Sequence, residues 1–152
     1  MKILVIGNGG REHALCMFIN KSPICDDLYC IPGSDSIKEI ANCFEIDPMN
    51  NDKILNFCVK YKIDFVIIGP ELPLSNGIVD KLKAGKINVF GPNKNSSQLE
   101  TSKIFMKNIC KENKIPTAKY SVFNEEKSAI NFLNEINFPT VIKLMGWLRE
   151  KE

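Results

Sequence analysis

The sequence has little histidine and no closely spaced cysteine pair. His13 is its one histidine, and none of its six cysteines forms a C-x-x-C pair with another. Structural zinc sites need four such ligands, often in closely spaced pairs, so we expect no zinc site. Several cysteines, such as Cys16 within Leu15-Cys16-Met17, stand where an apolar residue would be expected. Free cysteine behaves as a small hydrophobe, so we predict buried reduced thiols and a reducing, cytoplasmic location.

Long hydrophobic runs and an excess of one charge are also missing. The apolar run at residues 3–6 is too short for a signal-peptide core or a membrane span. The formal net charge is +2 over 152 residues, and acidic and basic residues are spread along the whole chain without a basic stripe. We therefore expect neither a nucleic-acid partner nor a membrane, and we expect a monomer.

What is present is an alternation of short apolar runs and helical patterns. The runs predict strands at residues 3–6, 28–31, 65–68 and 89–90, and apolar periodicity predicts helices at 12–20, 52–61 and 76–83. Asp52 and Asn76 are the expected N-caps, and Gly85 is the expected stop of the third helix. In the first helix, Leu15, Phe18 and Ile19 share one side. This order predicts an α/β fold, a Rossmann-like open parallel sheet with helices on both faces.

The pattern changes after Gly91-Pro92. One longer helix is predicted at residues 98–112, and Pro116 ends the segment because proline restricts both itself and the residue before it. A strand at 120–123, a helix at 125–136 and a strand at 139–143 follow. We thus expect a domain at 1–92, a connecting helix and linker at 93–116, and the beginning of a second domain at 117–152.

Gly7-Asn8-Gly9-Gly10 follows the first predicted strand directly and opens the first helix. Glycines let the backbone approach a ligand, and a helix N-terminus attracts an anion. The dinucleotide fingerprint G-x-G-x-x-G is incomplete because Glu12 stands at its third glycine, and the second strand lacks the acidic residue that would hold a ribose. A nicotinamide or flavin cofactor is therefore disfavoured. The alternative is a tight turn without a ligand.

Glycine also marks the ends of two further strands. Gly69-Pro70-Glu71 follows the run at 65–68, and Gly91-Pro92 follows the run at 89–90. Loops at the carboxyl ends of parallel strands line the ligand crevice of such sheets. There the Glu71 carboxylate would hold an amine or a ribose hydroxyl. Its alternative is a solvated carboxylate in a proline-rigidified loop.

These motifs, in this order, closely resemble the phosphoribosylamine–glycine ligase family, also called glycinamide ribonucleotide synthetases. The resemblance covers nearly the whole chain. The segments that carry it are Ile3-Leu4-Val5-Ile6-Gly7-Asn8-Gly9-Gly10-Arg11-Glu12-His13-Ala14, Pro32-Gly33, Gly69-Pro70-Glu71-Leu72-Pro73-Leu74, Gly91-Pro92-Asn93-Lys94, Gln98-Leu99-Glu100-Thr101-Ser102-Lys103, Ile115-Pro116-Thr117-Ala118 and Val141-Ile142-Lys143.

The resemblance implies an ATP-grasp ligase of purine biosynthesis. In that family ATP phosphorylates the glycine carboxylate, the amine of phosphoribosylamine attacks the acyl phosphate, and Mg²⁺ accompanies the nucleotide. By this analogy Gly7, Asn8, Gly9, Gly10 and Glu71 would hold phosphoribosylamine. Lys103 and Lys143 would approach the phosphates of ATP, because a lysine is a compact charge on a flexible stem. The alternative for Lys103 is a solvated helix lysine.

The tail, residues 144–152, departs from the family. The family continues after the lysine with an Ala-Asp-Gly-Leu-Ala-Ala-Gly-Lys-Gly type of loop, whereas this chain reads Leu-Met-Gly-Trp-Leu-Arg-Glu-Lys-Glu. Loss of one adenine from the Lys143 codon, in a suitable codon series, converts the first peptide into the second. We therefore hypothesise a frameshift after Lys143. We expect an inactive fragment with no retained catalytic residue, in which residues 1–92 fold and the second-domain piece is less ordered because it lacks sheet partners.

Overall fold

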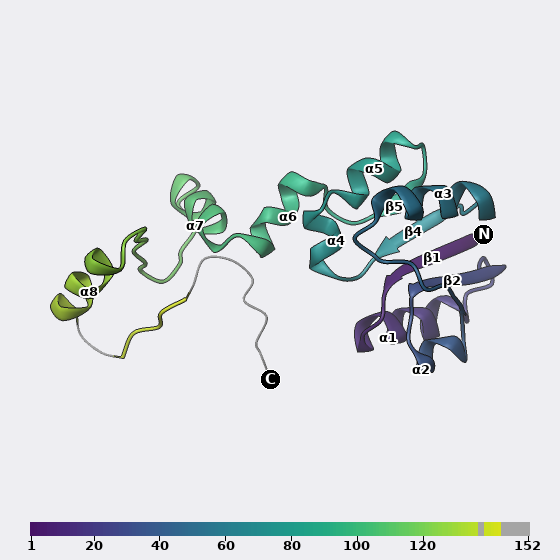
Figure 1. Ribbon diagram of the computed structural model, residues 1–152, viewed down its shortest axis with the longest axis horizontal. Coiled ribbons are helices and arrows are strands. Elements are labelled where there is room, and N and C mark those ends of the chain that lie inside the picture. Colours follow the sequence, from purple (N-terminus) through teal and green to yellow (C-terminus); the bar gives the residue numbers. More distant parts are fainter. Residues whose placement is uncertain (137–138, 144–152) are drawn as a thin grey trace. The chain divides into compact units, whose positions relative to one another are not determined.

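The computed structural model describes residues 1–136 and 139–143 of the chain (Figure 1). The chain divides into two compact units, Met1–Ser97 and Gln98–Glu152. The unusual tail at 144–152, with its proposed frameshift, lies outside the described residues.

The first unit contains a five-stranded parallel sheet in the order β3-β2-β1-β4-β5. Right-handed β-α-β crossovers are the usual way to join parallel strands, and here every pair of consecutive strands is separated by at least one helix. The predicted α/β class with an open parallel sheet is confirmed. The elements are β1 (Lys2–Gly7), α1 (Gly10–Ile19), β2 (Asp27–Pro32), α2 (Asp35–Lys38), β3 (Asn42–Cys43), α3 (Asn51–Tyr61), β4 (Phe65–Ile68), α4 (Glu71–Ser75), α5 (Ile78–Ala84) and β5 (Asn88–Phe90).

Helices cover both faces of the sheet, as the continuous apolar strands predict. Alternate residues of β1 point to opposite sides, so Leu4 and Ile6 join one core and Ile3 and Val5 join the other. The larger core lies under α3 and α5, and the smaller one lies under α1 and α2 (Figure 1). Burial of β1 on both faces leaves its carboxyl end as the place where functional groups can emerge.

Helix α1 buries only part of the side that its sequence indicates, because Ile19 packs against the smaller core whereas Leu15 and Phe18 are exposed. Glu12 and Cys16 are its buried residues, whereas Phe18 is 70% exposed. The apolar residues Leu15 and Phe18 therefore face outward, and a carboxylate takes a core position. This reversal is the first structural sign that Glu12 has a special role, since glutamate is rarely buried without a partner.

The predicted N-caps of α3 and α5 are both wrong. Asn50 caps α3 by accepting the Lys53 N–H at 3.0 Å, and Asp52 instead pairs with Lys81 across 2.6 Å. Gly77 caps α5 with φ 84°, a left-handed conformation that glycine adopts without strain. The predicted stop at Gly85 is confirmed as the C-cap of α5.

Short elements escaped the sequence analysis. The helix α2 has four residues and the edge strand β3 has two, too few for a periodic signal. The segment expected to be a loop after β4 contains the short helix α4, which begins at Glu71. Its Leu74 reaches the larger core, and so the loop is anchored rather than solvated.

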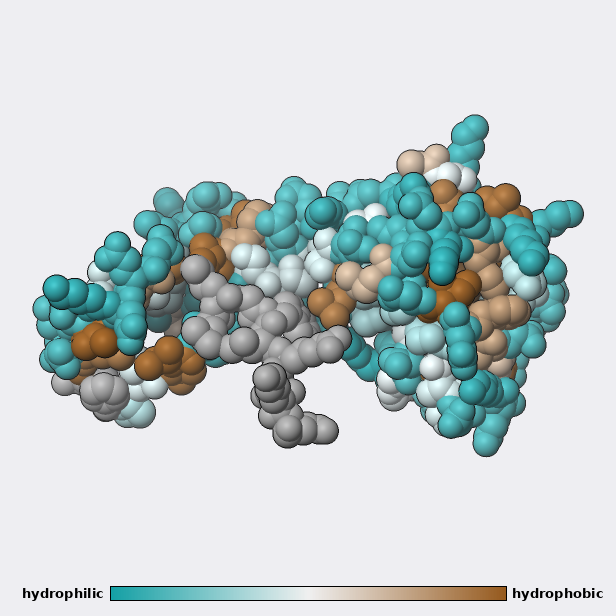
Figure 2. Space-filling view, viewed as in Figure 1, coloured by the Kyte–Doolittle hydropathy of each residue, from teal (hydrophilic) through white to brown (hydrophobic). Residues whose placement is uncertain are grey.

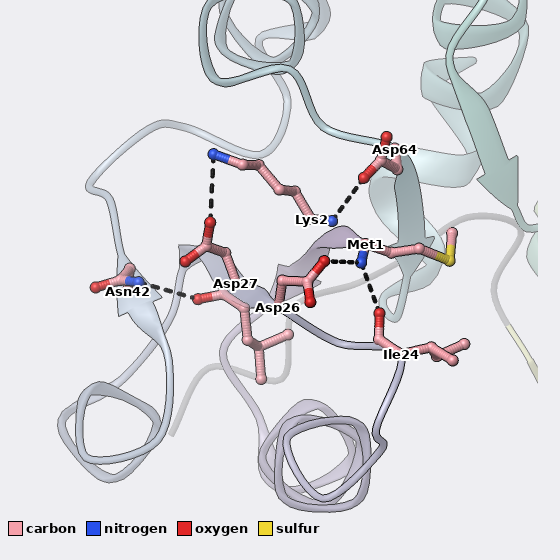
Figure 3. Close-up of polar contacts among 8 residues, drawn as sticks. Met1, Lys2, Ile24, Asp26, Asp27, Asn42 and Asp64 are labelled. Carbon is pink, nitrogen blue, oxygen red and sulfur yellow. Dashed lines mark hydrogen bonds and ion pairs between the residues drawn. The ribbon is translucent and has the colours of Figure 1, made fainter.

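The amino edge of the sheet is tied together by charges (Figure 3). The Met1 amino group lies 2.5 Å from Asp26 Oδ2 and also donates to the Ile24 carbonyl. Lys2 pairs with Asp27, and its backbone N–H donates to Asp64. These contacts join the starts of β1, β2 and β4 at the edge opposite to the glycine-marked loops.

The second unit begins within helix α6 (Lys94–Thr101) and contains α7 (Lys103–Glu112) and α8 (Glu126–Glu135). The predicted single helix at 98–112 is wrong because Ser102 interrupts it. Ser102 is extended, with φ −124° and ψ 102°, and its hydroxyl accepts the Phe105 N–H as the N-cap of α7. The helix predicted at 125–136 is confirmed as α8.

The strands predicted at 120–123 and 139–143 are wrong: neither segment is in a strand. Strands need a hydrogen-bonding partner, and the described part of the second unit contains no strand to pair with them. Lys107 of α7 instead contacts the segment at residues 117–120. Its ammonium donates to Thr117 Oγ1 and the Ala118 carbonyl, and it lies 5.2 Å from the centre of the Tyr120 ring.

The surface of the first unit is mixed in character. Hydrophilic side chains cover much of its visible face, with apolar ones scattered among them (Figure 2). Single exposed apolar residues such as Phe18 and Phe90 are common on folded proteins. In residues 1–136 and 139–143, no helix combines the length and apolar character needed to cross a membrane.

Candidate functional site

The sheet order reverses between β1 and β4, and we call the region at the carboxyl ends of these two strands the crevice, as in other open parallel sheets. The chain winds outward from β1 to β2 and β3 on one side, and then returns to β4 and β5 on the other. Ligands of open parallel sheets bind at the carboxyl ends of the strands where this reversal occurs. The loops at that point carry Gly7 and Gly69, both predicted from sequence to line a common edge.

The turn after β1 is open to a ligand. Gly7 ends the strand with φ 133°, a conformation that side chains rarely adopt, and it is buried. Asn8, Gly9 and Gly10 are exposed, and Gly9 is the N-cap of α1. A Cβ atom on Gly10 would meet nothing within 4 Å. The space beside the first residue of α1 is therefore open.

Glu12 occupies the space between the two glycine loops. Its side chain is turned back toward the start of α1, where Oε2 accepts the Gly9 N–H at 2.7 Å. A Cβ atom on Gly7 would lie 2.4 Å from Glu12 Cγ, and one on Gly69 would lie 2.1 Å from Oε1. Both loops must therefore be glycine at these positions for the carboxylate to fit.

The other carboxylate oxygen has no partner. Glu12 is 4% exposed, and no donor among the described residues reaches Oε1. A buried charged group without its full set of hydrogen bonds is costly to maintain. Its position at the first turn of α1 offsets part of that cost, because a helix N-terminus favours a negative charge.

Glu71 lies on the other side of the crevice, at the first position of α4. Its Oε1 accepts a hydrogen bond from Arg11 Nη2 at 3.0 Å, and the two side chains form an ion pair between α1 and α4. The hydrogen bond from its own backbone N–H is the largest cause that holds the pKa of this carboxyl below its ordinary value; burial opposes it, and the Arg11 guanidinium lowers the pKa further by smaller effects. The structure thus brings Glu71 to the same edge as the Gly7–Gly10 turn.

The remaining glycine-marked strand ends have packing explanations. Gly33 donates its N–H to the Gly7 carbonyl at 3.2 Å, and a Cβ atom there would lie 2.3 Å from Cys43 Sγ. A Cβ atom on Gly91 would lie 3.0 Å from Leu74 and 3.2 Å from Val79. Close packing against neighbouring side chains therefore explains glycine at both positions.

Two family models match consecutive parts of the chain. The model for the phosphoribosylglycinamide synthetase N domain matches residues 1–100, and the model for the ATP-grasp (A) domain of the same synthetase matches residues 101–152. The chain belongs to the phosphoribosylglycinamide synthetase family. The family resemblance read from the sequence motifs is confirmed.

Proteins named phosphoribosylamine–glycine ligase are similar to almost the whole of this chain, but they are much longer. A phosphoribosylamine–glycine ligase of Caldanaerobacter subterraneus is 40% identical over 99% of the chain, and one of Fusobacterium nucleatum is 41% identical over 96%. The chain spans 36% and 34% of their lengths, about a third. The similarity therefore concerns about a third of the length of these relatives.

Solved structures share the fold at lower identity. A phosphoribosylamine–glycine ligase of Thermotoga maritima superposes with a TM-score of 0.73 at 23% identity, over 97% of this chain and 34% of that one. The biotin carboxylase domain of 2-oxoglutarate carboxylase from Hydrogenobacter thermophilus, solved with MgADP, gives 0.69 at 17% identity, over 91% and 33%. At these identities the likeness concerns the fold alone, and it agrees with the predicted architecture.

The two lysines expected at ATP lie in the second unit of this synthetase-family chain. Lys103 is the first residue of α7 and is exposed, and Lys143 is also exposed. Among the described residues neither lysine forms an ion pair with an acidic side chain. They are solvated cations in this structure, so their part at ATP remains a prediction.

Sequence reasoning missed Glu12 as a site residue. The glycines of the motif were expected to bind a ligand, whereas Glu12 was considered only as the residue that replaces the third glycine of a dinucleotide fingerprint. One signal could have found it: a glutamate three residues after Gly9, at a helix start, can reach back to the backbone N–H of the cap. Arg11 was likewise quoted within the motif without a role, and it pairs with Glu71.

Proposed function

We propose that this chain is the substrate-side part of a phosphoribosylamine–glycine ligase of purine biosynthesis, and that it binds phosphoribosylamine at the carboxyl edge of its sheet. The observation that supports this is the placement of the Gly7–Gly10 turn and Glu71 on either side of the crevice between β1 and β4. Membership of the synthetase family supplies the reaction. The fold alone would not, because many unrelated functions share it.

The proposed reaction has two steps. A glycine carboxylate oxygen attacks the γ-phosphorus of ATP, the bond to the β-phosphate oxygen breaks, and ADP leaves. The nitrogen of phosphoribosylamine then attacks the carbonyl carbon of glycyl phosphate, phosphate leaves and the nitrogen loses a proton, giving glycinamide ribonucleotide. In this scheme the residues of the first unit bind and orient the amine substrate and take no covalent part.

Glu71 suits the amine substrate for electrostatic reasons. Its carboxylate accepts hydrogen bonds, and its lowered pKa keeps it ionised around neutral pH. Arg11 holds one oxygen of the carboxylate at 3.0 Å and so fixes the direction in which the other oxygen can accept. We propose that the other oxygen accepts from the amine or a ribose hydroxyl.

The nucleotide side is proposed on family grounds. Lys103 and Lys143 would approach the phosphates of ATP, and Mg²⁺ would offset charge on the nucleotide. In the described residues no group of three histidine, cysteine or acidic side chains could hold a metal ion. We therefore assign Mg²⁺ to no residue of this chain and derive no step from it.

For the 152-residue chain by itself we propose binding without ligation, in a monomer located in the cytoplasm. The chain contributes about a third of the length of its relatives, and the two lysines are the nucleotide contacts that we assign to it. The alternative function is a stand-alone module that binds phosphorylated ribose without catalysis. Under this alternative, no coding sequence for an ATP-grasp domain would follow the Lys143 codon. The coding frame next to the Lys143 codon decides between them.

The experiment joins sequencing and assay. If the neighbouring frame continues into an ATP-grasp domain, the repaired polypeptide should form glycinamide ribonucleotide and ADP from the three substrates, whereas the 152-residue chain should form neither. The Glu71→Gln variant of the repaired protein should raise the KM for phosphoribosylamine more than that for ATP. Glu39→Gln, at an exposed carboxylate at the C-cap of α2, is the matched control. A repaired protein without ligase activity would overturn the proposal.

A further inference from the structure

The buried Glu12 carboxylate sets the chemical character of the crevice floor. Its Oε2 accepts the N–H of Gly9, the N-cap of α1, at 2.7 Å. A phosphate arriving at this helix start would compete with a carboxylate that is already there. The anion site expected from the glycine motif is therefore partly occupied by the protein itself.

The charges around the crevice do not cancel. Arg11 and Glu71 form an ion pair with each other. Glu12 belongs to none of the ion pairs found among the described residues, and its Oε1 lacks a hydrogen-bond donor. A negative charge in a poorly solvated position acts over several ångströms, because the surrounding protein screens it less than water does. The floor between the two loops is thus acidic.

The carboxylate also fixes the two loops relative to each other. Its side chain fills the volume beside Gly7 and Gly69, where Cβ atoms would lie 2.4 Å and 2.1 Å from Glu12 atoms. Backbone from β1 and β4 thus packs directly on one side chain, and the Gly69 N–H donates to the Ile6 carbonyl at 3.0 Å beside it. Movement of Glu12 would change the separation of both loops.

We propose that Glu12 is a positioning and specificity-determining residue, which links the β1 and β4 loops and makes the crevice accept the amine-and-hydroxyl side of the sugar phosphate rather than its phosphate. This inference rests on the proposed function. Hydroxyl and amine groups donate hydrogen bonds toward an acidic floor, whereas a phosphate group is repelled by it. The substrate therefore lies with its C1 end at the Gly7–Gly10 turn and its phosphate directed away.

The test uses the 152-residue chain with two stable probes, ribose 5-phosphate and inorganic phosphate. Amide signals of Gly9 and Gly69 are followed by NMR during titration with each probe. For the natural chain we expect ribose 5-phosphate to bind more tightly than phosphate. In Glu12→Gln, which keeps the shape and removes the charge, phosphate binding should strengthen about fivefold and the preference should shrink, as expected for one charge at this range. Glu39→Gln should leave both affinities unchanged.

A second measurement needs no variant. In the natural chain, nuclear Overhauser effects should connect the Gly9 and Gly69 amide protons to the protons at C1 and C2 of the ribose. Contacts to the C5 protons beside the phosphate would overturn the proposed orientation. An unchanged probe preference in a folded Glu12→Gln chain would overturn the role of Glu12 while leaving the proposed function in place. Failure of the natural chain to bind ribose 5-phosphate would overturn both.

Discussion

Arg11 Nη2 lies 3.0 Å from Glu71 Oε1, which joins the helix after β1 to the helix after β4 across the crevice between these strands. The two residues are sixty positions apart in the sequence. Both side chains remain partly open to solvent, with exposed fractions of 69% for Arg11 and 25% for Glu71. A pair of this kind contributes more to the orientation of Glu71 than to stability, because water screens it.

The first prediction concerns the titration of Glu71. The hydrogen bond from its own backbone N–H and the Arg11 guanidinium together lower its pKa. Arg11→Met should therefore raise the pKa of Glu71 part of the way to the ordinary value, measured by carbon NMR of its carboxyl group. Lys38→Met, which removes an exposed cation elsewhere, is the control. Equal Glu71 pKa values in the natural chain and Arg11→Met would contradict the role assigned to the pair.

The sign of the linked effect on stability follows from that direction. A carboxyl whose pKa is lower in the folded state contributes stability above its unfolded pKa, and this contribution is lost as pH falls through the folded pKa. Arg11→Met should accordingly reduce stability slightly at neutral pH and leave it unchanged in strong acid. Thermal unfolding at the two pH values measures the difference.

The second prediction concerns Gly69. A Cβ atom at this position would lie 2.1 Å from Glu12 Oε1, so Gly69→Ala forces the buried carboxylate or the loop to move. We expect a loss of about 1–3 kcal/mol in the free energy of unfolding, as for other overpacked sites, measured with urea. Gly10→Ala is the matched control, because its Cβ atom would meet nothing within 4 Å and it lies at a helix start.

A double variant separates steric conflict from general damage at this site. If Glu12 is the obstacle, adding Glu12→Ala to Gly69→Ala should destabilise the chain by less than the sum of the single changes. Simple addition of the two losses would show that Gly69 is needed for another reason.

The third prediction uses the cysteines. All six are free, and burial raises the pKa of Cys58 to about 12. Cys16 and Cys30 are fully buried as well, and a hydrogen bond between them lowers the pKa of Cys16. We expect Cys25 and Cys110, which are partly exposed, to react with iodoacetamide first. The buried Cys16, Cys30 and Cys58 should react only when the chain unfolds. Mass spectrometry of labelled peptides gives the order. Early labelling of Cys16 would mean that its lowered pKa outweighs its burial.

The fold could be predicted from sequence further than the site. Four strands of the sheet emerged because apolar runs buried on both faces, such as Leu4 to Ile6, leave a strong local signal. The strand β3 and the helix α2 are too short to leave one. The N-cap of α3 was misplaced by two residues because Asn50 and Asp52 have equal capping ability, and only the backbone decides between them.

The sequence indicated Gly7–Gly10 and Glu71 at one end of the sheet, but it gave no part to Glu12, which lies between their loops. In the sequence Glu12 is an ordinary polar residue of a surface helix, because its burial depends on Gly69, 57 positions later in the chain. Ser102 likewise breaks a helix whose apolar period runs through it, because its hydroxyl caps the following turn. Both errors have one cause: a side-chain hydrogen bond to a backbone N–H overrides local propensity.

The fourth prediction concerns the amino edge of the sheet, where the Met1 amino group lies 2.5 Å from Asp26 (Figure 3). The hydrogen bond between them lowers the pKa of Asp26 and raises that of the amino group. Stability from Asp26 is lost as pH falls through its lowered pKa, and stability from the amino group is lost as pH rises through its raised pKa. Asp26→Asn should therefore lower the melting temperature most near neutral pH. A loss of equal size in strong acid and strong alkali would contradict this pairing.

The fifth prediction concerns the local stability of the second unit. Residues 117–122 are exposed and in no strand, and the described part of this unit has helices without a sheet to cover. Amide exchange depends on hydrogen-bonded, buried backbone, so we expect strong protection in β1 and β4, less in α7, and little across residues 117–123. Hydrogen–deuterium exchange with mass spectrometry measures this in the 152-residue chain. Uniform strong protection from residue 117 to residue 143 would contradict this expectation. It would indicate hydrogen-bonded strands at 120–123 and 139–143, as the sequence predicted.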